Sequence, residues 1–509
     1  MSGHSHVLRK CEAVTGLPWV SIVLPVILLS DIFLRLIYYL HNGSLQLDEA
    51  ALARNILDRG TMALLGPLDY NQGAPVLFLL LVHAATTLFG SSEFALRLVP
   101  LLASFISLIL FYLTAKLFID EQYVPIAVIM FGFSYNLVYY SNEAKQYSTD
   151  VAVAVTLTYL SLRLLRPVEV HKTDVLLLGL AGVVAIFLSH PAVFVLVGIG
   201  TTLTILAARN RFIFLRNALG LVIVVWGACF VVNYLFFLRS LSSNEFLLNW
   251  WKHGFLPISM STTAIKSWFD IGMSFLSYCD YGDGWQVFVL ALTSVAVGVA
   301  ITNKSAATLM ITAYFVSALF ASVMGKYPFS DRLSLYLIPF VILLAVKGLQ
   351  ISSYKKTVSV YAILALCLLV PSLRSLYHLV SQPIVNAEEV RLLLAYLHSY
   401  RRPNDHVYIY WGAEHAVKYY LREKDSQDEF VHYGVRSRDD RSKYIAAIDS
   451  MKQYPRVWFL FSAKNRDEEH FFLSFPFHID GELLEQHHKP GASLYLYRFP
   501  HVGSERTLY

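Results

Sequence analysis

The sequence predicts a polytopic α-helical membrane protein with a small α/β domain at its C-terminal end. Of the 509 residues, 56% are hydrophobic and only 15% are charged, whereas soluble proteins carry about 25% charged residues. The charge is also unevenly distributed. Of the 77 charged residues (41 Lys and Arg plus 36 Asp and Glu), 35 lie in residues 386–509. We therefore expect a transmembrane domain over residues 1–380 and a soluble domain over residues 381–509.

Long apolar segments supply the candidate membrane spans. A helix needs about 20 apolar residues to cross a bilayer. Twelve segments approach that length: roughly 17–40, 74–89, 94–118, 123–140, 148–165, 174–190, 191–208, 217–237, 285–303, 306–324, 333–350 and 357–378. The first is too long for the apolar part of a signal peptide, and we interpret it as a retained span.

Basic residues decide which segments cross, because Lys and Arg collect on the cytoplasmic side. If all twelve segments cross, Arg9 and Lys10 lie opposite the clusters at 163–172 and 209–216. If the 16-residue segment 74–89 lies in the interface plane instead, all six basic clusters fall on one side. These clusters are Arg9/Lys10, Lys116, Arg163/Arg166/Lys172, Arg209/Arg211/Arg216, Lys304 and Lys347/Lys355/Lys356. We therefore predict eleven spans with the N-terminus inside.

This topology places several polar segments on the external face. They are the long first loop 41–93, the turn 141–150, the second large loop 238–284, the segment 325–332 and the C-terminal domain. In that domain we expect strands at His406–Trp411, Val457–Phe461 and Ser493–Phe499, separated by helices at 412–422 and 438–452. Such alternation is typical of a small α/β domain.

An acidic pair, Asp48 and Glu49, begins a helical stretch in the first external loop. One interpretation is that both acids cap this helix and complement its dipole. The other is that a carboxylate just above the membrane acts as a general base or binds the acceptor.

The turn 141–150 has the sequence Ser-Asn-Glu-Ala-Lys-Gln-Tyr-Ser-Thr-Asp. Glu143, Tyr147 and Asp150 are spaced i, i+4, i+7, so the spacing predicts that they share one helix face. A solvated turn with a helix cap is one interpretation. A functional site is the other, because polar residues this dense between two spans are costly when buried.

Cations also lie on the predicted external face, against the positive-inside trend. Lys326 and Arg332 belong to the segment Gly-Lys-Tyr-Pro-Phe-Ser-Asp-Arg, and Arg97 and His190 lie at external ends of spans. Such cations favour a carboxylate or phosphate partner, although a lone His there is also common as an interfacial side chain. The set suits a substrate with an apolar tail and a phosphate.

These motifs, taken in order, resemble a known family. An acidic pair in the first loop is followed by an interfacial helix and by Ser92-Glu93-Phe94-Ala95-Leu96-Arg97-Leu98 at the start of a span. A Glu-x-Lys-Gln-Tyr-Ser-x-Asp turn and a late Arg before a Pro-containing span complete the set. Over residues 15–350 the chain resembles the GT-C membrane glycosyltransferases of the protein O-mannosyltransferase and aminoarabinose transferase type, and the resemblance suggests a bacterial member.

The resemblance implies transfer of a sugar from a polyprenyl-phosphate donor to a lipid, glycan or protein of the cell envelope, outside the inner or plasma membrane. Asp48 would be the catalytic base, supported by Glu49. Arg97 and Arg332 would hold the donor phosphate with Lys145 or Lys326. The substrate-binding residues would be Glu143, Tyr147, Asp150 and His190. The pattern departs from the family where Arg332 is followed by Leu333 and not by Tyr.

The expected chemistry requires no cofactor. A phosphate leaves readily, so one carboxylate to deprotonate the acceptor and cations to stabilise the leaving group suffice, and a single displacement inverts the anomeric carbon. A divalent metal near Asp48 is left open. Two rival interpretations also stay open: a membrane transporter, which would explain many spans with polar groups, and a lipid-linked oligosaccharide ligase.

Overall fold

We describe a computed structural model of the chain. The structure describes residues 18–165, 171–209, 216–259, 261–282, 284–353, 358–381, 388–421, 429–437, 440–462 and 481–500. The basic residues Arg9, Lys10, Arg166, Arg211, Lys355 and Lys356, on which part of the topology prediction rests, lie outside these residues. The chain forms two compact units. Unit 1 comprises residues 1–40, 61–90 and 94–383, and unit 2 comprises residues 41–60, 91–93 and 384–509.

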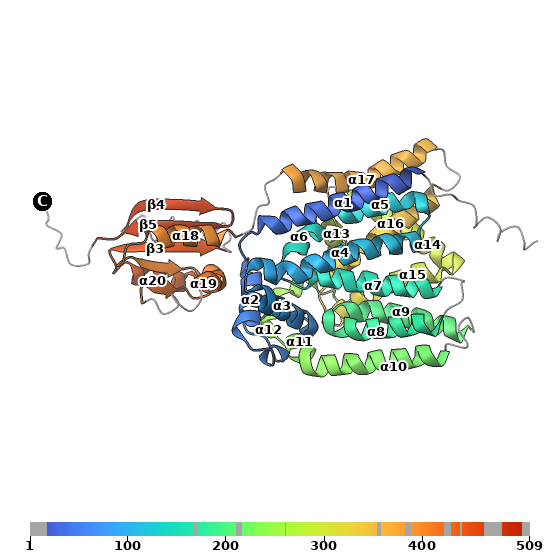
Figure 1. Cartoon of the computed structure of the whole chain (residues 1–509), viewed down its shortest axis with the longest axis horizontal. Coiled ribbons are helices and arrows are strands. Elements are labelled where there is room, and N and C mark those ends of the chain that lie inside the picture. Colours follow the sequence, from blue (N-terminus) through green and yellow to red (C-terminus); the bar gives the residue numbers. More distant parts are fainter. Residues whose placement is uncertain are drawn as a thin grey trace, which may run out of the picture. The chain divides into compact units, whose positions relative to one another are not determined.

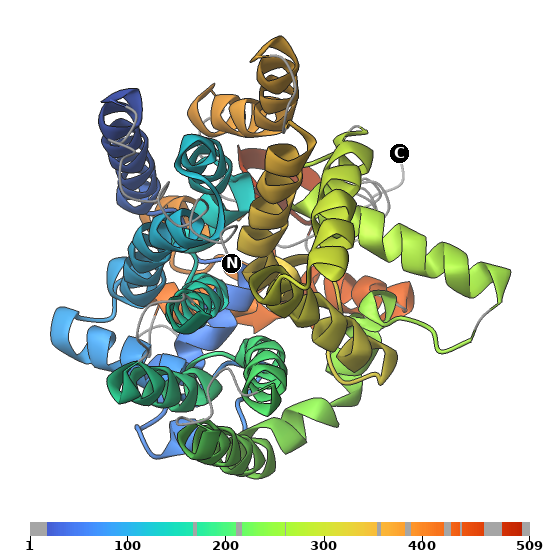
Figure 2. The ribbon, with the colours of Figure 1, turned by 90° about the vertical axis from the view of Figure 1, so that its right-hand side faces the viewer.

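Unit 1 is a bundle of long apolar helices that lie side by side (Figure 1) and are seen nearly end-on in Figure 2. Its main helices are α1 (Pro18–His41), α3 (Val76–Phe89), α4 (Glu93–Phe118), α5 (Val124–Gly132), α6 (Tyr135–Tyr139), α7 (Tyr147–Leu165), α8 (Lys172–Leu188), α9 (Ala192–Ala208), α10 (Arg216–Asn233), α13 (Thr262–Tyr278), α14 (Trp285–Asn303), α15 (Ala306–Val323), α16 (Ile338–Ser352) and α17 (Val358–Ser381).

Short helices connect the long ones in unit 1. They are the 3₁₀ helices η2 (Ala63–Leu65), η3 (Glu121–Tyr123), η4 (Tyr140–Asn142), η7 (Lys252–Gly254) and η8 (Asp331–Leu337), the π-helix η6 (Tyr234–Leu238), and α11 (Arg239–Ser242) and α12 (Glu245–Trp250). Many large apolar side chains on the long helices are exposed, for example Leu88, Leu221 and Phe320 at 75%, 65% and 66%. Exposed apolar surface of this extent is expected where helices face lipid.

Length and hydropathy identify eight helices able to cross a membrane in the described part of the chain, or nine if a bent pair is one span. The bent pair, Glu121–Gly132 and Tyr135–Asn142, turns by 59°. The segment predicted to lie flat is α3, and its 14 residues give about 21 Å at 1.5 Å per residue. That length agrees with its exclusion from the spans, since the hydrocarbon core is about 30 Å thick.

Hydrogen bonds from three elements fix the bend between α5 and α6. Arg35 of α1 donates to the carbonyl of Leu137 at 3.0 Å. The Asp280 carboxylate accepts the backbone N–H of Tyr135 at 2.9 Å, and Asn136 donates to the Tyr278 carbonyl at 2.7 Å. These bonds satisfy backbone groups that the break leaves outside a helical ladder, and they set the direction in which the chain enters the polar turn at residues 141–150.

Unit 2 contains a five-stranded mixed sheet in the order β2-β1-β3-β5-β4. β1 (His406–Ile409) pairs in parallel with β2 (Val431–Tyr433) and β3 (Arg456–Ser462), whereas β5 (Ala492–Arg498) is antiparallel to β3 and β4 (Glu482–Lys489). Helices α18 (Val390–Tyr400), α19 (Glu414–Leu421) and α20 (Arg441–Met451) and the 3₁₀ helix η9 (Trp411–Ala413) complete the C-terminal part.

The central strands of this sheet are buried on both faces. Alternate residues of β3, such as Phe459 and Phe461, share a core with Tyr444 and Ile448 of α20. On the opposite face Trp458 packs against Tyr396 of α18, with ring centres 6.3 Å apart. Helices on two faces require central strands that are apolar throughout, which is why the run Val-Trp-Phe-Leu-Phe forms β3.

Unit 2 also takes in a segment from the long first loop. α2 (Leu47–Asp58) packs there with α19, and its residues Ala50, Leu52, Ala53 and Ile56 are fully buried. The helix that carries the predicted catalytic acid therefore belongs to the same compact unit as the C-terminal sheet.

Candidate functional site

Only one of the two acids at the start of α2 belongs to the helix cap. The side chain of Gln46 caps the helix, and Glu49 completes a capping box by accepting the backbone N–H of Gln46 at 3.2 Å. Glu49 is 1% exposed. The capping interpretation therefore describes Glu49, whereas Asp48, which is half-buried, is not a member of that box.

Within unit 2, Asp48 lies near a half-buried histidine of α19, His415. Burial lowers the pKa of His415 to about 4, the Arg54 and Lys418 cations contribute to the lowering, and the carboxylates of Glu414 and Asp48 oppose it. His415 is therefore neutral at pH 7. Its Nδ1 lies 3.2 Å from a guanidinium nitrogen of Arg54, so α2 and α19 are joined by a polar contact beside Asp48. Sequence reasoning did not single out His415.

In unit 1, the polar turn at residues 141–150 is buried. Glu143, Lys145, Tyr147 and Asp150 are only 6%, 5%, 5% and 5% exposed, so the interpretation as a solvated turn is wrong. The prediction that Glu143 shares a helix face with Tyr147 and Asp150 is also wrong. Glu143 is extended, with φ −109° and ψ 139°, and α7 begins only at Tyr147, because the chain makes a tight turn in which the Lys145 N–H donates to the Glu143 carbonyl at 2.7 Å.

The buried Lys145 is bound to a segment of the long first loop. Its Nζ donates to the side-chain oxygen of Gln72 at 2.6 Å, and Gln146 donates to the Gly73 carbonyl at 3.3 Å. The segment before α3 thus closes over the polar turn. No pattern in the sequence pointed to Gln72 as a partner, because the two residues are 73 positions apart.

Arg332, the late cation, lies in η8 between two aromatic rings. Its guanidinium carbon is 5.6 Å from the ring centre of Tyr147 and 5.5 Å from that of Trp251. Tyr140 meets Tyr147 edge to face, with ring centres 5.1 Å apart. The structure therefore brings together two predicted residues, Arg332 and Tyr147, and adds Trp251 from the second large loop. Aromatic faces stabilise a guanidinium that lies over them, while its N–H groups point outward in the plane of the guanidinium itself.

Asp150 lies in the first turn of α7 among polar side chains from other elements. The Ser189 hydroxyl lies beside its carboxyl group. Burial raises the pKa of Tyr327, in the loop after α15, well above its usual value, and the neighbouring Asp150 carboxylate, Tyr336 and Tyr147 raise it further. Tyr327 donates to the Leu333 carbonyl at 3.0 Å.

Several buried polar atoms in this region have no hydrogen-bond partner among the residues that the structure describes. They are Oε1 of Gln146, Oγ1 of Thr149, Oδ1 of Asp150, both ring nitrogens of His190 and the hydroxyl oxygen of Tyr336. Buried polar atoms without partners are costly and uncommon in native structures. Their concentration at one end of α7, α9 and η8 is what a binding site for a polar molecule requires.

Two further predicted cations differ in exposure. Arg97 is buried, at 6% exposed, near the start of α4. Lys326 is exposed in the turn after α15. Of the two, only Arg97 is shielded from water by the surrounding protein, which strengthens its attraction for an anion.

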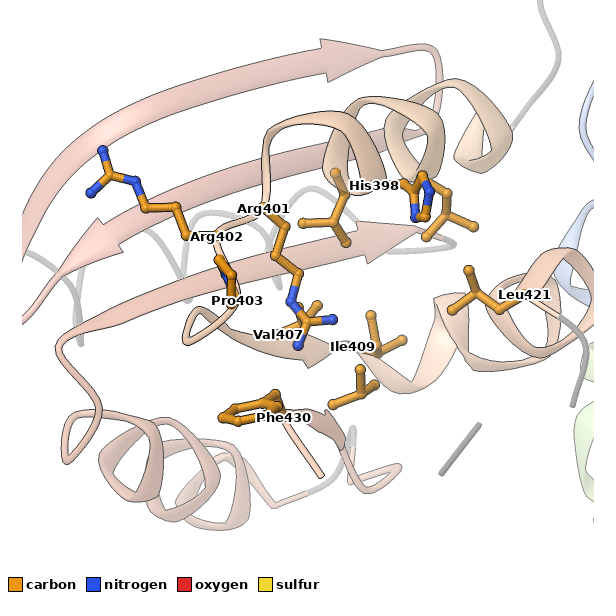
Figure 3. A pocket seen from close by; sticks show the side chains of 11 residues that line it. His398, Arg401, Arg402, Pro403, Val407, Ile409, Leu421 and Phe430 are labelled. Carbon is orange, nitrogen blue, oxygen red and sulfur yellow. The ribbon is translucent and has the colours of Figure 1, made fainter. Parts of the chain in front are cut away.

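Unit 2 contains a separate pocket of about 420 Å³, shown in Figure 3, into which the Arg401 side chain extends beside the ring of Phe430. It is lined by Leu394, Leu397, His398, Arg401, Arg402, Pro403, Val407, Ile409, Leu421, Phe430 and Val431. None of the predicted site residues lines this pocket.

Within the described ranges, no three His, Cys, Asp or Glu side chains are placed to hold a metal ion. Asp48, near which the sequence leaves a divalent metal open, belongs to unit 2.

Comparisons with known proteins relate this bundle of apolar helices and its small α/β unit to membrane glycosyltransferases. The model of the dolichyl-phosphate-mannose-protein mannosyltransferase family matches residues 73–236. This match and the shared fold confirm the resemblance that the sequence motifs predict. No curated protein matches the sequence significantly.

Solved structures share the fold over most of the chain. ArnT from Cupriavidus metallidurans in the apo state is 12% identical, has a TM-score of 0.51, and covers 94% of this chain and 97% of its own. The structure of the same protein bound to undecaprenyl phosphate is 12% identical, has a TM-score of 0.51, and covers 94% of this chain and 98% of its own. The oligosaccharyltransferase from Archaeoglobus fulgidus tethered with an acceptor peptide is 9% identical, has a TM-score of 0.52, and covers 87% of this chain and 69% of its own.

Proposed function

We propose that this protein is an integral-membrane glycosyltransferase that takes a sugar from a polyprenyl-phosphate-linked donor. The acceptor is a lipid, glycan or protein of the cell envelope, and the reaction takes place on the external face of the cell membrane. One observation carries the proposal: buried cations and unpaired polar atoms lie within a fold shared with an enzyme whose structure holds undecaprenyl phosphate.

The cations of unit 1 suit the donor phosphate. Arg97 and Lys145 are buried, and Arg332 is held between two aromatic rings. In an environment of low dielectric constant, such groups stabilise the negative charge that develops as a phosphate leaves. Lys326 is exposed, so it is better suited to attract the donor than to stabilise the leaving group.

The unpaired polar atoms suit the sugar or the acceptor. Asp150, Tyr147 and His190 border the region where Oδ1 of Asp150 and both nitrogens of His190 lack partners. A hydroxylated ligand supplies both donors and acceptors, so it satisfies a carboxylate oxygen and a histidine ring together. Glu143, just before α7, lies at the same end of this bundle.

Asp48 is proposed as the general base. It takes the proton of the acceptor hydroxyl or amine as the acceptor atom bonds to the anomeric carbon. The bond from that carbon to the phosphate oxygen breaks, and polyprenyl phosphate leaves with the bonding electrons. One displacement of this kind inverts the anomeric configuration. Glu49 supports Asp48 by holding the first turn of α2.

The proposed topology has eleven spans with the N-terminus inside. It counts the eight long helices, the bent pair α5 and α6, and the helices α8 and α9. α8 and α9 have 17 residues each, about 26 Å at 1.5 Å per residue, which nearly matches the hydrocarbon core. Under this topology the first loop, the polar turn and η8 begin on the external face.

A second candidate is transfer of a lipid-linked oligosaccharide in place of a single sugar. The observation in its favour is the TM-score of 0.52 with the Archaeoglobus fulgidus oligosaccharyltransferase. Both candidates share the donor phosphate and the proposed base.

The test uses purified protein in vesicles with radiolabelled polyprenyl-phosphate-sugar and envelope extract. We expect transfer by the wild type and a loss of at least 100-fold in kcat for Asp48→Asn. Asp58→Asn is the matched control, because Asp58 ends the same helix, is exposed and pairs with Arg54 at 3.4 Å. A fully active Asp48→Asn variant removes Asp48 as the base. A retained anomer rules out single displacement, and solute transport without any transfer supports a transporter.

A further inference from the structure

The loop that leads to Asp48 is bound through its backbone by the C-terminal part of the chain. The N–H of Leu45 donates to the hydroxyl of Tyr420 at 2.8 Å, and the N–H of Leu47 donates to the carboxylate of Glu388 at 2.8 Å. Two side chains that lie at least 341 positions later in the sequence thus accept hydrogen bonds from backbone N–H groups within three residues of Asp48.

The start of the same loop is bound in the same way. The hydroxyl of Ser44 donates to Glu389 at 2.9 Å, and the Ser44 N–H donates to the same carboxylate at 3.4 Å. Glu389 is 8% exposed and lies directly before α18, so its position is fixed by the helix and sheet behind it. With the Gln46 N–H bound to Glu49, each backbone N–H from Ser44 to Leu47 has an acceptor.

Tyr420 and Arg391 connect this loop to the beginning of α4. The Tyr420 hydroxyl donates to Glu93 at 3.1 Å while it accepts the Leu45 N–H. Arg391 forms an ion pair with Glu93 at 2.8 Å and donates to the Asn42 carbonyl at 2.7 Å. A single phenol and a single guanidinium therefore hold three segments that are far apart in the sequence.

These bonds fix a buried stretch of chain that has no regular secondary structure, since Ser44 and Leu45 are 1% and 0% exposed. Residues 42–46 form no helix or strand, so their conformation depends on such contacts. The helix behind Asp48 is also well packed, with Ala50 and Ala53 fully buried. The direction of the Asp48 carboxylate is set by the first turn of α2, and that turn is set by the loop.

We propose that the C-terminal domain positions the catalytic base, with Tyr420, Glu388 and Glu389 acting as positioning residues for Asp48. This inference rests on the proposed function of Asp48. A displacement of about 1 Å in a reacting group costs on the order of 100-fold in rate, so loss of one backbone anchor slows proton transfer. The donor phosphate is assigned to cations of unit 1, so its binding is unchanged.

The main test is Tyr420→Phe, which removes one hydroxyl and keeps the ring. We expect kcat to fall about 10-fold or more, with the KM for the donor within about twofold of wild type. Hydrogen exchange of the amides of residues 44–47 in the full-length protein is expected to accelerate. Tyr396→Phe is the matched control, because it removes a hydroxyl of the same unit that donates to Glu485 at 3.0 Å, and we expect it to change neither readout.

A pair of substitutions at Glu388 separates positioning from fold stability. Glu388→Gln keeps an oxygen that accepts the Leu47 N–H, so we expect it to retain most of the kcat. Glu388→Ala removes the acceptor and is expected to lose about 10-fold. Equal activity of the two variants contradicts the role of this bond.

The outcomes for positioning and for function are distinct. Wild-type kcat in Tyr420→Phe, where Asp48→Asn is inactive, overturns the positioning role and leaves the proposed function in place. An increase in donor KM at constant kcat also overturns it. Full activity of Asp48→Asn overturns the role of Asp48, and the positioning of a base with it.

Discussion

The guanidinium of Arg332 lies between the rings of Tyr147 and Trp251, at 5.6 Å and 5.5 Å from their centres. These two aromatic residues come from the polar turn and from the second large loop. They hold the cation in one orientation, which is what recognition of a phosphate requires.

Loss of one ring is expected to weaken donor binding. Trp251→Leu removes one cation–π contact, worth about 0.5 to 2 kcal/mol, so the KM for the donor should rise about 2- to 30-fold while kcat changes little. Steady-state kinetics with varied donor concentration measures this effect. Trp250→Leu is the control, since Trp250 is adjacent in the chain, 48% exposed and stacked on Phe246. An unchanged KM in Trp251→Leu contradicts the role of Arg332.

The buried ion pair of α1 is expected to stabilise the fold only while both of its members are present. Arg35 donates to Asp31 at 3.0 Å and to the Leu137 carbonyl at 3.0 Å, and both side chains are buried. Arg35→Met leaves a buried carboxylate unpaired, which costs about 3 to 5 kcal/mol, so the midpoint of thermal unfolding in detergent should fall by several degrees. The double variant Asp31→Asn, Arg35→Met should recover part of the loss. No difference between the single and double variants would refute the pairing.

Helices α14 and α16 are expected to tolerate no side chain at Gly348. A Cβ there meets the backbone carbonyl of Leu292, and backbone cannot move aside as a flexible side chain does. We expect Gly348→Ala to destabilise the protein by about 1 to 3 kcal/mol, the usual cost of overpacking. Gly298→Ala is the control on α14, where a Cβ has open space and helix propensity favours Ala. Equal thermal midpoints for the two variants would show that this crossing is looser than described.

His415 is expected to make the α2–α19 contact acid-sensitive. Its pKa falls from 6.5 to about 4 on folding, mainly through burial. Between these values the unfolded state binds more protons than the folded state, so stability falls as the pH drops from about 6.5 to 4. The loss is at most about 3 kcal/mol, at 1.36 kcal/mol per pH unit.

Hydrogen exchange of α19 in the full-length protein, corrected for intrinsic rates, measures this sensitivity. We expect faster exchange at pH 5 than at pH 7 in the wild type and a smaller difference in His415→Gln. His398→Gln, which alters an exposed His of the same unit, should behave as wild type. The same pH response in wild type and His415→Gln would exclude His415 as the source.

Elements with strong local patterns could be predicted from the sequence. The strands expected at His406–Trp411, Val457–Phe461 and Ser493–Phe499 correspond to β1, β3 and β5, because buried central strands are continuous apolar runs. β2 and β4 escaped prediction. β2 has three residues, and β4 is a polar edge strand, Glu-Leu-Leu-Glu-Gln-His-His-Lys, with an irregularity between Leu483 and Glu485. Neither carries an apolar alternation.

For the candidate site, residue types could be used to predict which segment is involved, but the sequence did not reveal which residues contact that segment. The density of polar residues at 141–150 indicated a site, yet Gln72, Trp251 and Ser189 became visible only through tertiary contacts. The error at Glu143 arose because i, i+4 spacing presumes an unbroken helix, and the chain turns before Tyr147. Likewise, nothing local to Leu45 or Leu47 indicates that Tyr420 or Glu388 binds them.

The anchors of the Asp48 loop also impose an order of synthesis. Leu47 and Leu45 leave the ribosome 341 and 375 residues before Glu388 and Tyr420. At about 5 to 20 residues per second, the interval is roughly 20 to 75 seconds. Under the proposed positioning, the nascent chain completes its membrane insertion while the base still lacks its support. Competence for catalysis then arrives only after Glu388 and Tyr420 have been translated, so a nascent chain that lacks them cannot act on the donor pool of the membrane.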